Sequence, residues 1–288
     1  MQPFFFTVID MIYTTENSIV LKDYSNFSAK DILECGQIFR YNKKSDGYEV
    51  FSTDKYAVVT EQDNVITITT DDVKYFYNFF DLDTDYGAVC DRLAARSDIL
   101  RQAVEYGKGI RILNQDLTEM LFSFIISANN NIKRIQLIVN RLSENLGTKT
   151  KYGYAFPTVE QMASASVEDF ARMGAGYRAP YLYDTAQKLK NGYDLSKLYT
   201  MDTEMARKEL LSFKGVGPKV ADCVLLFGLK KQDVFPVDTW IKKVYHNYFE
   251  QGHKDSEIAC YFVSQFGEDA GLCQQYLFYF QRKYGQTK

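Results

Sequence analysis

One lysine and one aspartate, nineteen residues apart, occupy positions that would suit covalent chemistry. Lys219 directly follows the glycine-rich stretch 214–218 (KGVGP) and falls in the first turn of an expected helix. The positive end of a helix dipole disfavours an ammonium group there, and the neutral amine is the form of lysine that attacks carbon to give a Schiff base. We predict that Lys219 is a nucleophile; a solvated lysine without a chemical role is the plainer alternative.

The aspartate lies in the sequence FPVDTW, residues 235–240. Asp238 is well placed to be the N-cap of a helix that runs through Tyr245, and capping alone would explain its presence. A carboxylate held by backbone N–H groups can also stabilise a cationic sugar or assist a nucleophile. Because one side chain can do both, we predict that Asp238 is the carboxylate partner of Lys219.

The segment around Lys219 predicts two amphipathic helices over residues 203–229, joined by the tight turn 214–217. Gly215 and Gly217 permit positive φ angles, and Pro218 fits the first position of a helix. The unpaired N–H groups at such a helix N-terminus can bind a phosphate oxygen without reading the base sequence. An ordinary helical hairpin is the alternative, since glycine is common in turns.

The rest of the chain predicts an α+β protein. Apolar and polar residues alternate over residues 47–70 in three pieces, which is typical of a short antiparallel meander. We expect a sheet domain with flanking helices over residues 1–108 and a helical domain over 109–288. Helical spacing is found over residues 86–106, 118–129, 132–146, 166–173, 179–190, 203–212, 219–229 and 270–284.

Composition excludes several classes of protein. Of the 288 residues 46% are hydrophobic and 25% charged, which is enough for a packed core. The five cysteines lack CxxC or CxxxxC spacing, which argues against a disulfide framework, a zinc site or an iron–sulfur cluster and for a reducing, cytoplasmic setting. The apolar N-terminus lacks a basic leader and Asp10 interrupts it, so we expect no signal peptide and no membrane span.

Charge is distributed unevenly along the chain. Net charge is −3, but residues 1–100 carry 9 Lys or Arg against 17 Asp or Glu, whereas residues 101–288 carry 25 against 20. The acidic excess therefore lies in the first third of the chain. A basic face that binds nucleic acid remains compatible with the helical part.

The sequence KGVGPKVADC followed by PVDTW resembles the helix-hairpin-helix DNA glycosylase superfamily. A lysine directly after GVGP is similar to the bifunctional glycosylase/lyase branch, and the four clustered cysteines of endonuclease III-like members are absent here. Residues 36–41 (GQIFRY), 109–116 and 122–134 resemble the 8-oxoguanine DNA glycosylases, over about residues 26–284. This resemblance implies an antiparallel, TBP-like sheet domain packed on an all-helical glycosylase domain.

The resemblance also implies a pocket for the damaged base. The Gly36 carbonyl would accept a hydrogen bond from N7–H of 8-oxoguanine, an atom that carries a lone pair in guanine. Gln274 would read the Watson–Crick edge, while Phe278 and Cys223 would lie on opposite faces of the base. Without the resemblance these are ordinary core or turn residues. The implied base-binding set is Gly36, Cys223, Pro236, Asp238, Gln274 and Phe278.

A base inside a duplex must be extruded before it can be cut. By resemblance, Asn129 would fill the vacated space, Tyr177 would enter the base stack, and Arg134 with Arg178 would read the orphaned cytosine, which suits the planar fork of arginine. On their own these residues are a turn and surface charges. Further DNA contacts are expected at Gly215, Gly217 and Trp240.

Two positions depart from the family pattern. Trp240 stands where animal members have histidine, and Lys214 replaces a common proline and is expected to add a phosphate contact. The resemblance implies no metal for the chemistry. A structural monovalent or divalent cation at the carbonyls of Leu211, Phe213 and Val216 is compatible with it.

We therefore predict a monomeric, bifunctional DNA glycosylase/AP lyase that acts on duplex DNA containing 8-oxoguanine, without a required cofactor. It would be cytoplasmic, and nucleoid-associated in a prokaryote. Two alternatives remain open. One is a non-catalytic hairpin module that only binds DNA, and the other is a glycosylase for alkylated or ring-opened purines.

Overall fold

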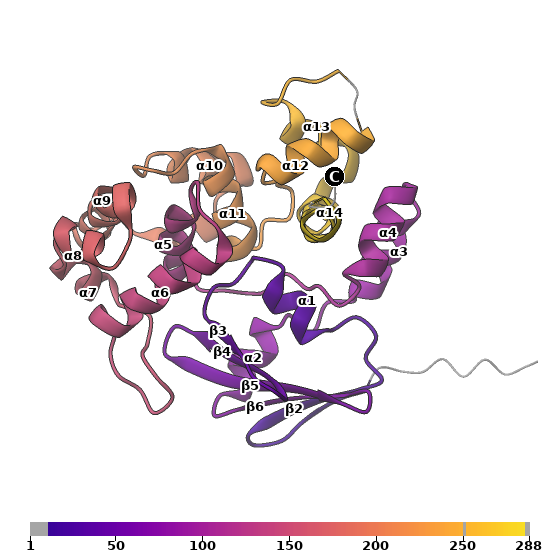
Figure 1. The fold of residues 1–288 in the computed structure, drawn as a ribbon, viewed down its shortest axis with the longest axis horizontal. Coiled ribbons are helices and arrows are strands. Elements are labelled where there is room, and N and C mark those ends of the chain that lie inside the picture. The colour runs from indigo at the N-terminus through magenta and orange to yellow at the C-terminus, as the bar shows by residue number, and fades with distance from the viewer. Residues whose placement is uncertain (1–10, 250–251, 286–288) are drawn as a thin grey trace, which may run out of the picture.

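The structure is a computed structural model and describes residues 11–249 and 252–285. The apolar stretch at residues 1–10, on which the expectation about a signal peptide rests, lies outside these residues. Within them, each helix is too short or too polar to cross a membrane. A sheet at one side of the molecule and a larger group of helices on the other confirm the α+β class (Figure 1).

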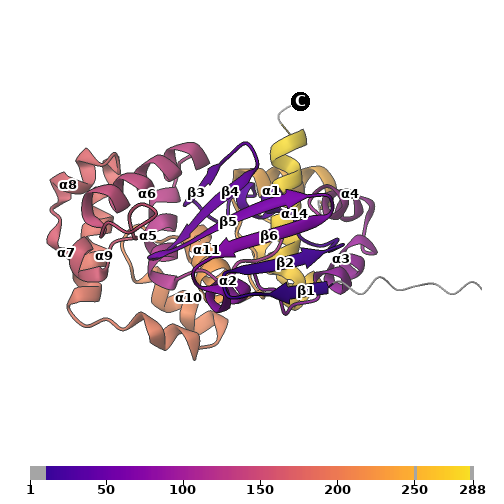
Figure 2. The same ribbon diagram turned by 90° about the horizontal axis from the view of Figure 1, so that it is seen from below.

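The sheet has six antiparallel strands in the order β1-β2-β6-β5-β4-β3 (Figure 2). The meander expected over residues 47–70 is confirmed, because Tyr48 pairs with Val59 and Val59 with Ile68 on successive strands. The alternation did not predict the other three strands. The strand bounds are β1 Met11–Thr14, β2 Ser18–Lys22, β3 Tyr41–Lys43, β4 Gly47–Ser52, β5 Lys55–Gln62 and β6 Val65–Thr70.

One face of the sheet is buried beneath two helices, α1 (Ala29–Glu34) and α2 (Val73–Phe79). The alternating residues Val50, Val59 and Ile68 are fully buried there, as the period of a half-buried strand requires. Figure 1 shows α1 between the sheet and the helical part. This short helix therefore carries the chain that follows it towards the helices.

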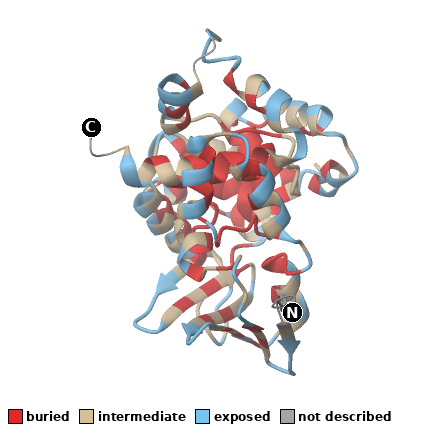
Figure 3. Ribbon diagram, turned by 90° about the vertical axis from the view of Figure 1, so that its right-hand side faces the viewer, coloured by how far each residue is buried: buried red, intermediate tan, exposed pale blue. Residues whose placement is uncertain are grey.

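The helical part is built around α5 (Leu117–Ser127) and α11 (Pro218–Leu229), which pack against each other. Both are buried on nearly all sides, and Figure 3 shows the buried residues gathered at the centre of the helices. Within the described residues, eight further helices surround this pair, in addition to two over residues 86–106: α6 Ile132–Leu146, α7 Val159–Ser164, α8 Val167–Arg172, α9 Ala179–Lys190, α10 Thr203–Leu211, α12 Thr239–Val244, α13 Ile258–Phe266 and α14 Ala270–Tyr284.

The prediction of a single helix over residues 86–106 is wrong. The structure has two, α3 (Tyr86–Ala94) and α4 (Asp98–Tyr106), and the Ser97 side chain between them accepts from the N–H of Leu100 as an N-cap. The first helix ends at Ala94 and the Ser97 cap begins a second one, even though the apolar spacing continues through both. Helix α4 packs against α14, and the buried residues of both α3 and α4 belong to the core of the helical part.

Two buried polar side chains join the sheet to the helices. The Gln37 amide donates to the Arg111 carbonyl at 2.7 Å and accepts from the Leu113 N–H at 3.0 Å. Arg40 forms an ion pair with Glu119 of α5, and the side chains of both are only 4% exposed. These contacts fix the segment that follows α1 relative to α5.

Candidate active site and DNA interface

Lys219 lies in the first turn of α11, as predicted. Gly217 is the N-cap and Pro218 takes the first helical position. The side chain is partly buried, and its Nζ donates to the hydroxyl of Ser127 at 3.4 Å. The same Nζ lies 5.4 Å from the centre of the Phe124 ring. The amine is therefore held against the C-terminal end of α5.

Asp238 is the N-cap of α12, which confirms the expected capping role. Its Oδ1 accepts from the N–H groups of Trp240 and Ile241, both at 2.9 Å. The helix continues beyond Val244 as the π-helical segment Tyr245–Phe249. The ion pairs found in the described parts of the chain do not join Asp238 to Lys219. The carboxylate is thus held in place by backbone groups and not by the lysine.

Cys223 lies near both of these charged groups, one helical turn after Lys219. It is 4% exposed, and burial raises the pKa of its thiol to about 11, although the neighbouring Lys219 acts to lower it. The neighbouring Lys219 does not activate this thiol, because the loss of solvent outweighs the effect of the nearby cation. Cys223 is a neutral thiol at physiological pH.

Gln274 on α14 reaches the loop that precedes Asp238. Its Nε2 donates to the Pro236 carbonyl at 3.2 Å, and the side chain is 5% exposed. Its Oε1 is buried and has no hydrogen-bond partner among the described residues. Because buried polar atoms are nearly always paired in native structures, an unpaired one points to a group supplied from outside the chain.

Gly36 lies against Phe278, one helical turn beyond Gln274. Its φ of +96° is a conformation that side chains disfavour. A Cβ on Gly36 would lie 3.3 Å from Cε1 of Phe278 and 3.0 Å from Cδ1 of Ile132. The structure therefore brings together Gly36 and Phe278, which are far apart in the sequence, and a side chain at Gly36 would crowd the Phe278 ring.

Two residues of α14 that the sequence did not single out hold the segment around Gly36. Gln275 donates to the Cys35 carbonyl at 3.4 Å, and Arg282 donates to the Glu34 carbonyl at 3.1 Å. Polar residues beside an otherwise apolar helix face are the signal that would have found them. The backbone of Gly36 is thereby tied to the helix that carries Gln274 and Phe278.

The NNN sequence forms the connection from α5 to α6. Asn129 is exposed and has a φ of +48°, which is uncommon for a residue other than glycine. Asn131 caps α6 by accepting from the N–H of Arg134 at 3.0 Å. Arg134 is exposed. Ile132, which approaches Gly36, places this connection beside the Gly36–Phe278 contact.

The plainer alternative, that Arg178 is only a surface charge, is wrong. Arg178 is 3% exposed, and its Nε donates to the Ala128 carbonyl at 2.8 Å. Tyr177 remains 55% exposed while its hydroxyl donates to the same carbonyl at 3.0 Å. The Arg178 guanidinium lies 4.3 Å from the centre of the Tyr177 ring. Both side chains thus engage the Asn129 connection, and an Arg178 that reads cytosine would first have to leave it.

The hairpin between α10 and α11 is confirmed, with Gly215 at a φ of +80°. A Cβ on Gly215 would lie 2.4 Å from Cδ2 of Tyr181, so only glycine fits there. Gly217 is exposed, with open space around it. Lys214, for which a phosphate contact is expected, forms a largely exposed ion pair with Asp184 of α9 at 2.7 Å. Its ammonium is already partnered by a carboxylate.

A buried ion pair that the sequence did not reveal joins the two hairpin helices. Nε of Arg207 on α10 lies 2.8 Å from Oδ1 of Asp222 on α11. Burial raises the pKa of Asp222, while Arg207 acts to lower it. The pair lies one residue from Cys223 and therefore helps to set the position of the helix that carries Lys219.

The cation expected at the hairpin would be bound by the carbonyls of Leu211, Phe213 and Val216. The Phe213 carbonyl accepts from the N–H of Val216 at 3.1 Å, which shapes the turn. No group of three or more His, Cys, Asp or Glu side chains that could hold a metal occurs within residues 11–249 and 252–285. The expected hairpin site is of another kind, because its ligands would be backbone carbonyls.

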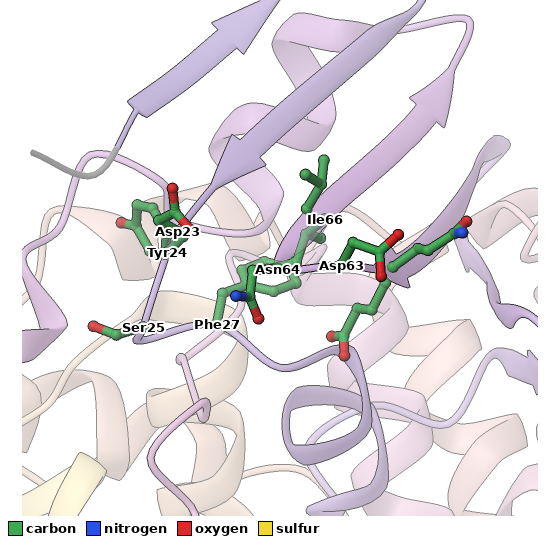
Figure 4. Close-up of a pocket in the computed structure, with 10 residues that line it drawn as sticks. Asp23, Tyr24, Ser25, Phe27, Asp63, Asn64 and Ile66 are labelled. Atoms are coloured by element: carbon green, nitrogen blue, oxygen red, sulfur yellow. The ribbon is translucent and has the colours of Figure 1, made fainter. Parts of the chain in front are cut away.

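A hollow of about 820 Å³ on the sheet domain is separate from these residues (Figure 4). Asp23, Glu61 and Asp63 contribute carboxyl groups to its lining. Three carboxylates would repel a phosphate backbone. The lining consists of Asp23, Tyr24, Ser25, Phe27, Glu61, Gln62, Asp63, Asn64, Val65 and Ile66. It shares no residue with the Lys219 group.

Two family models together match most of the chain. The model described as "8-oxoguanine DNA glycosylase, N-terminal domain" matches residues 19–121. The model described as "HhH-GPD superfamily base excision DNA repair protein" matches residues 122–261. The first covers the sheet from Ile19 onwards, without β1, together with the Gly36 segment, and the second covers the hairpin, Lys219 and Asp238.

Known relatives agree with both models. The chain is 34% identical to the N-glycosylase/DNA lyase of Saccharomyces cerevisiae, over 76% of this chain and 68% of that protein. It is 30% identical to a probable N-glycosylase/DNA lyase of Methanothermobacter thermautotrophicus, over 74% and 75% of the two chains.

A solved structure of the Clostridium acetobutylicum 8-oxoguanine glycosylase/lyase, in complex with double-stranded DNA containing cytosine opposite 8-oxoguanine, superposes with a TM-score of 0.90. The two proteins are 37% identical, and the match covers 96% of this chain and 99% of that one. With the hairpin, the lysine, the capping aspartate and the sheet in place, this chain belongs to the 8-oxoguanine DNA glycosylases of the HhH-GPD superfamily of base excision DNA repair proteins.

Proposed function

We propose that this enzyme removes 8-oxoguanine from duplex DNA with Lys219 as nucleophile and then cleaves the strand as an AP lyase. The observation that carries the proposal is the convergence of three distant segments. Lys219 and Cys223 come from α11, Asp238 from the start of α12, and Gln274 with Phe278 from α14. The yeast N-glycosylase/DNA lyase and the Clostridium 8-oxoguanine glycosylase/lyase are named for the same pair of activities.

Recognition of the base would use groups that the fold holds rigid. The Gly36 carbonyl would accept from N7–H, a hydrogen that guanine lacks, and a mismatch there costs about 1 to 3 kcal/mol. The unpaired Oε1 of Gln274 is available to a donor on the Watson–Crick edge. Phe278 would stack on one face of the base, with the neutral Cys223 thiol near the other.

The reaction begins with the neutral amine of Lys219. Its lone pair forms a bond to C1′, and the electron pair of the C1′–N9 bond leaves with the base, which takes up a proton. Proton loss from the nitrogen and opening of the C1′–O4′ bond then give a Schiff base. Removal of a C2′ proton expels the 3′ phosphate and cuts the strand. The Asp238 carboxylate would stabilise the cationic sugar.

Binding of the duplex would rest on the hairpin and on the Asn129 connection. Gly217, the N-cap of α11, has open space around it, and the N–H groups of this helix start, with those of the turn at Gly215, would suit a phosphate oxygen. Trp240 adds a partly buried aromatic side chain beside Asp238. A cation at the carbonyls of Leu211, Phe213 and Val216 would strengthen this contact.

The opposite strand would meet the side chains next to the NNN sequence. Asn129 would occupy the space of the extruded nucleotide, and Tyr177 would enter the stack, since both are exposed. Arg134 is free to contact the orphaned cytosine, whereas Arg178 would join it after releasing the Ala128 carbonyl. We further propose that the enzyme acts as a monomer.

Borohydride trapping on duplex DNA containing 8-oxoguanine tests the nucleophile. We expect a covalent adduct with the wild-type enzyme and none with Lys219→Gln. Lys208→Gln, an exposed lysine on α10, is the matched control and should trap normally. An adduct that survives in Lys219→Gln contradicts the assignment of the nucleophile. No adduct with the wild type would contradict the lyase proposal, and a wild type that also releases no base would be a hairpin protein that only binds DNA.

The choice of base is tested with duplexes that differ only in the lesion. Release of 8-oxoguanine should exceed release of alkylated or ring-opened purines, because only the first offers N7–H while keeping the ring intact. Faster release of 3-methyladenine or of a ring-opened purine would assign the enzyme to those lesions.

A further inference from the structure

Ser127, the last residue of α5, lies beside the proposed nucleophile. It is 7% exposed, and its Oγ is 3.4 Å from Nζ of Lys219. The same hydroxyl donates to the Phe124 carbonyl at 2.7 Å. The two residues of this contact are 92 positions apart in the sequence, so only the packing of α5 on α11 brings them together.

The direction of the Ser127–Lys219 hydrogen bond follows from the number of protons. A hydroxyl has a single hydrogen to donate, and in Ser127 that hydrogen goes to the Phe124 carbonyl. The oxygen can therefore only accept from Lys219. One N–H of the lysine must point at Ser127, and in the neutral amine the lone pair must point elsewhere.

The surroundings of this contact are rigid. The Phe124 ring, 5.4 Å from Nζ, stacks on Phe227 with centres 5.4 Å apart and meets the edge of Phe39 at 5.5 Å. A close-packed aromatic group of this kind leaves Ser127 little freedom to move. The acceptor that orients the amine is thus fixed before a substrate arrives.

The other polar groups near the amine are poorer anchors. Asp238 forms no hydrogen bond or ion pair with Lys219 among the described residues, and its Oδ1 accepts from the N–H groups of Trp240 and Ile241. The Cys223 sulfur is a weak acceptor, and burial keeps it in the thiol form. Ser127 is therefore the strongest neutral acceptor in contact with Lys219 in the described part of the structure.

We propose that Ser127 is a positioning residue for Lys219, which holds one N–H of the amine and aims its lone pair at C1′. This inference rests on the proposed function, since it needs Lys219 to be the nucleophile. Misplacing a nucleophile by about 1 Å can slow a reaction roughly 100-fold. Loss of the Ser127 hydroxyl should therefore slow the attack on C1′ while leaving DNA binding unchanged.

The test compares Ser127→Ala with Ser123→Ala, one turn earlier on the same helix. Ser123 is 1% exposed, and its hydroxyl has no hydrogen-bond partner among the described residues, so its removal matches the loss of a buried hydroxyl without the lysine contact. Each variant is measured by single-turnover excision of 8-oxoguanine, by borohydride trapping and by the Kd for the same duplex. Thermal unfolding would test whether both variants are folded.

We expect Ser127→Ala to excise and trap roughly 10- to 100-fold more slowly at an unchanged Kd, and Ser123→Ala to match the wild type. Ser127→Thr, which keeps a hydroxyl at the same place, should recover most of the rate. Equal rates for Ser127→Ala and Ser123→Ala overturn the inference, as does a folded Ser127→Thr that is as slow as Ser127→Ala. If Ser127→Ala is unfolded, the test rests on Ser127→Thr. Excision by Ser127→Thr at the wild-type rate supports the inference. Slower excision by Ser127→Thr at an unchanged Kd opposes it.

Failure of this inference is distinguishable from failure of the proposed function. A wild-type enzyme that forms no adduct contradicts the role of Lys219 and with it the whole proposal. A wild-type enzyme that traps through Lys219, with Ser127→Ala trapping at the same rate, contradicts the role of Ser127 alone.

Discussion

Arg178 donates a hydrogen bond from Nη2 to the carbonyl oxygen of Asn129 at 2.9 Å and so links the start of α9 to the end of α5. Its Nε donates to the neighbouring Ala128 carbonyl. Asn129 has a positive φ that is uncommon outside glycine. Arg178 therefore supports the backbone of the residue that we propose to enter the duplex.

Replacement of Arg178 should affect both stability and reading of the opposite base. Arg178→Ala removes the hydrogen bonds that this buried guanidinium donates to the carbonyls of Ala175, Ala128 and Asn129, so we expect the free energy of unfolding to fall by about 2 kcal/mol. Excision opposite cytosine should slow more than excision opposite the other bases. Urea unfolding and single-turnover excision with each of the four opposing bases measure these effects. Arg172→Ala, an exposed arginine of α8, is the control and should change neither.

A side chain at Gly36 should block the base. Gly36→Ala would place a Cβ 3.3 Å from Phe278 at a φ of +96°. Gly192→Ala is a matched control, since Gly192 has a φ of +99° but open space around it. Both should lose about 1 kcal/mol of stability from the backbone, whereas only Gly36→Ala should slow excision, roughly 100-fold. Equal excision by the two variants would contradict a base contact at Gly36.

The Cys223 thiol makes part of the stability depend on pH. Because burial raises its pKa from 9.0 to about 11, the folded state holds this proton more tightly than the unfolded chain does. Its stabilising contribution is complete below pH 9 and is lost as the pH rises towards 11. The stability difference between wild type and Cys223→Ala should fall by roughly 1 kcal/mol from pH 7 to pH 10. Denaturant unfolding at both values measures it, with Cys260→Ala as the exposed control.

Removing only one partner of the Arg207–Asp222 ion pair should lower the free energy of unfolding. The Asp222 side chain is only 7% exposed, so Arg207→Ala would leave a buried carboxylate unpaired and lower the free energy of unfolding by about 3 kcal/mol. Glu204, the other partner of Arg207, is 81% exposed, and Glu204→Ala should cost little. In the double variant Arg207→Met, Asp222→Leu, much of the stability should return. Urea unfolding curves that show equal losses for Arg207→Ala and Glu204→Ala would contradict this account.

Patterns among residues close together in the sequence were sufficient to predict many helices and strands. Helices α6, α9 and α14 begin and end where the apolar spacing predicts, and Asp238 caps α12 as expected. The three strands over residues 47–70 likewise follow from alternation. Capping bonds and helical or strand periodicity join residues only a few positions apart, so the sequence carries them directly.

Other elements depended on contacts that no local pattern contains. The expected helix over residues 86–106 is divided at Ser97, and β1 with β2 extends the sheet through pairing with β6. A serine inside a helical pattern can remain in the helix or cap a new one, and the packing of α4 on α14 favours the second arrangement. Strand pairing over long separations is likewise decided by the assembled core.

The sequence by itself determined which residues of this protein are suited to the chemistry: a lysine at a helix start, an aspartate at a helix cap and a glycine-rich hairpin, together with the family pattern that contains them. Only the tertiary structure decided the partners of those side chains. It paired Lys214 with Asp184, buried Arg178 against Ala128, and placed Ser127 beside Lys219. These contacts join segments separated by 30 to 92 residues, and such distances close only when helices pack around a common core.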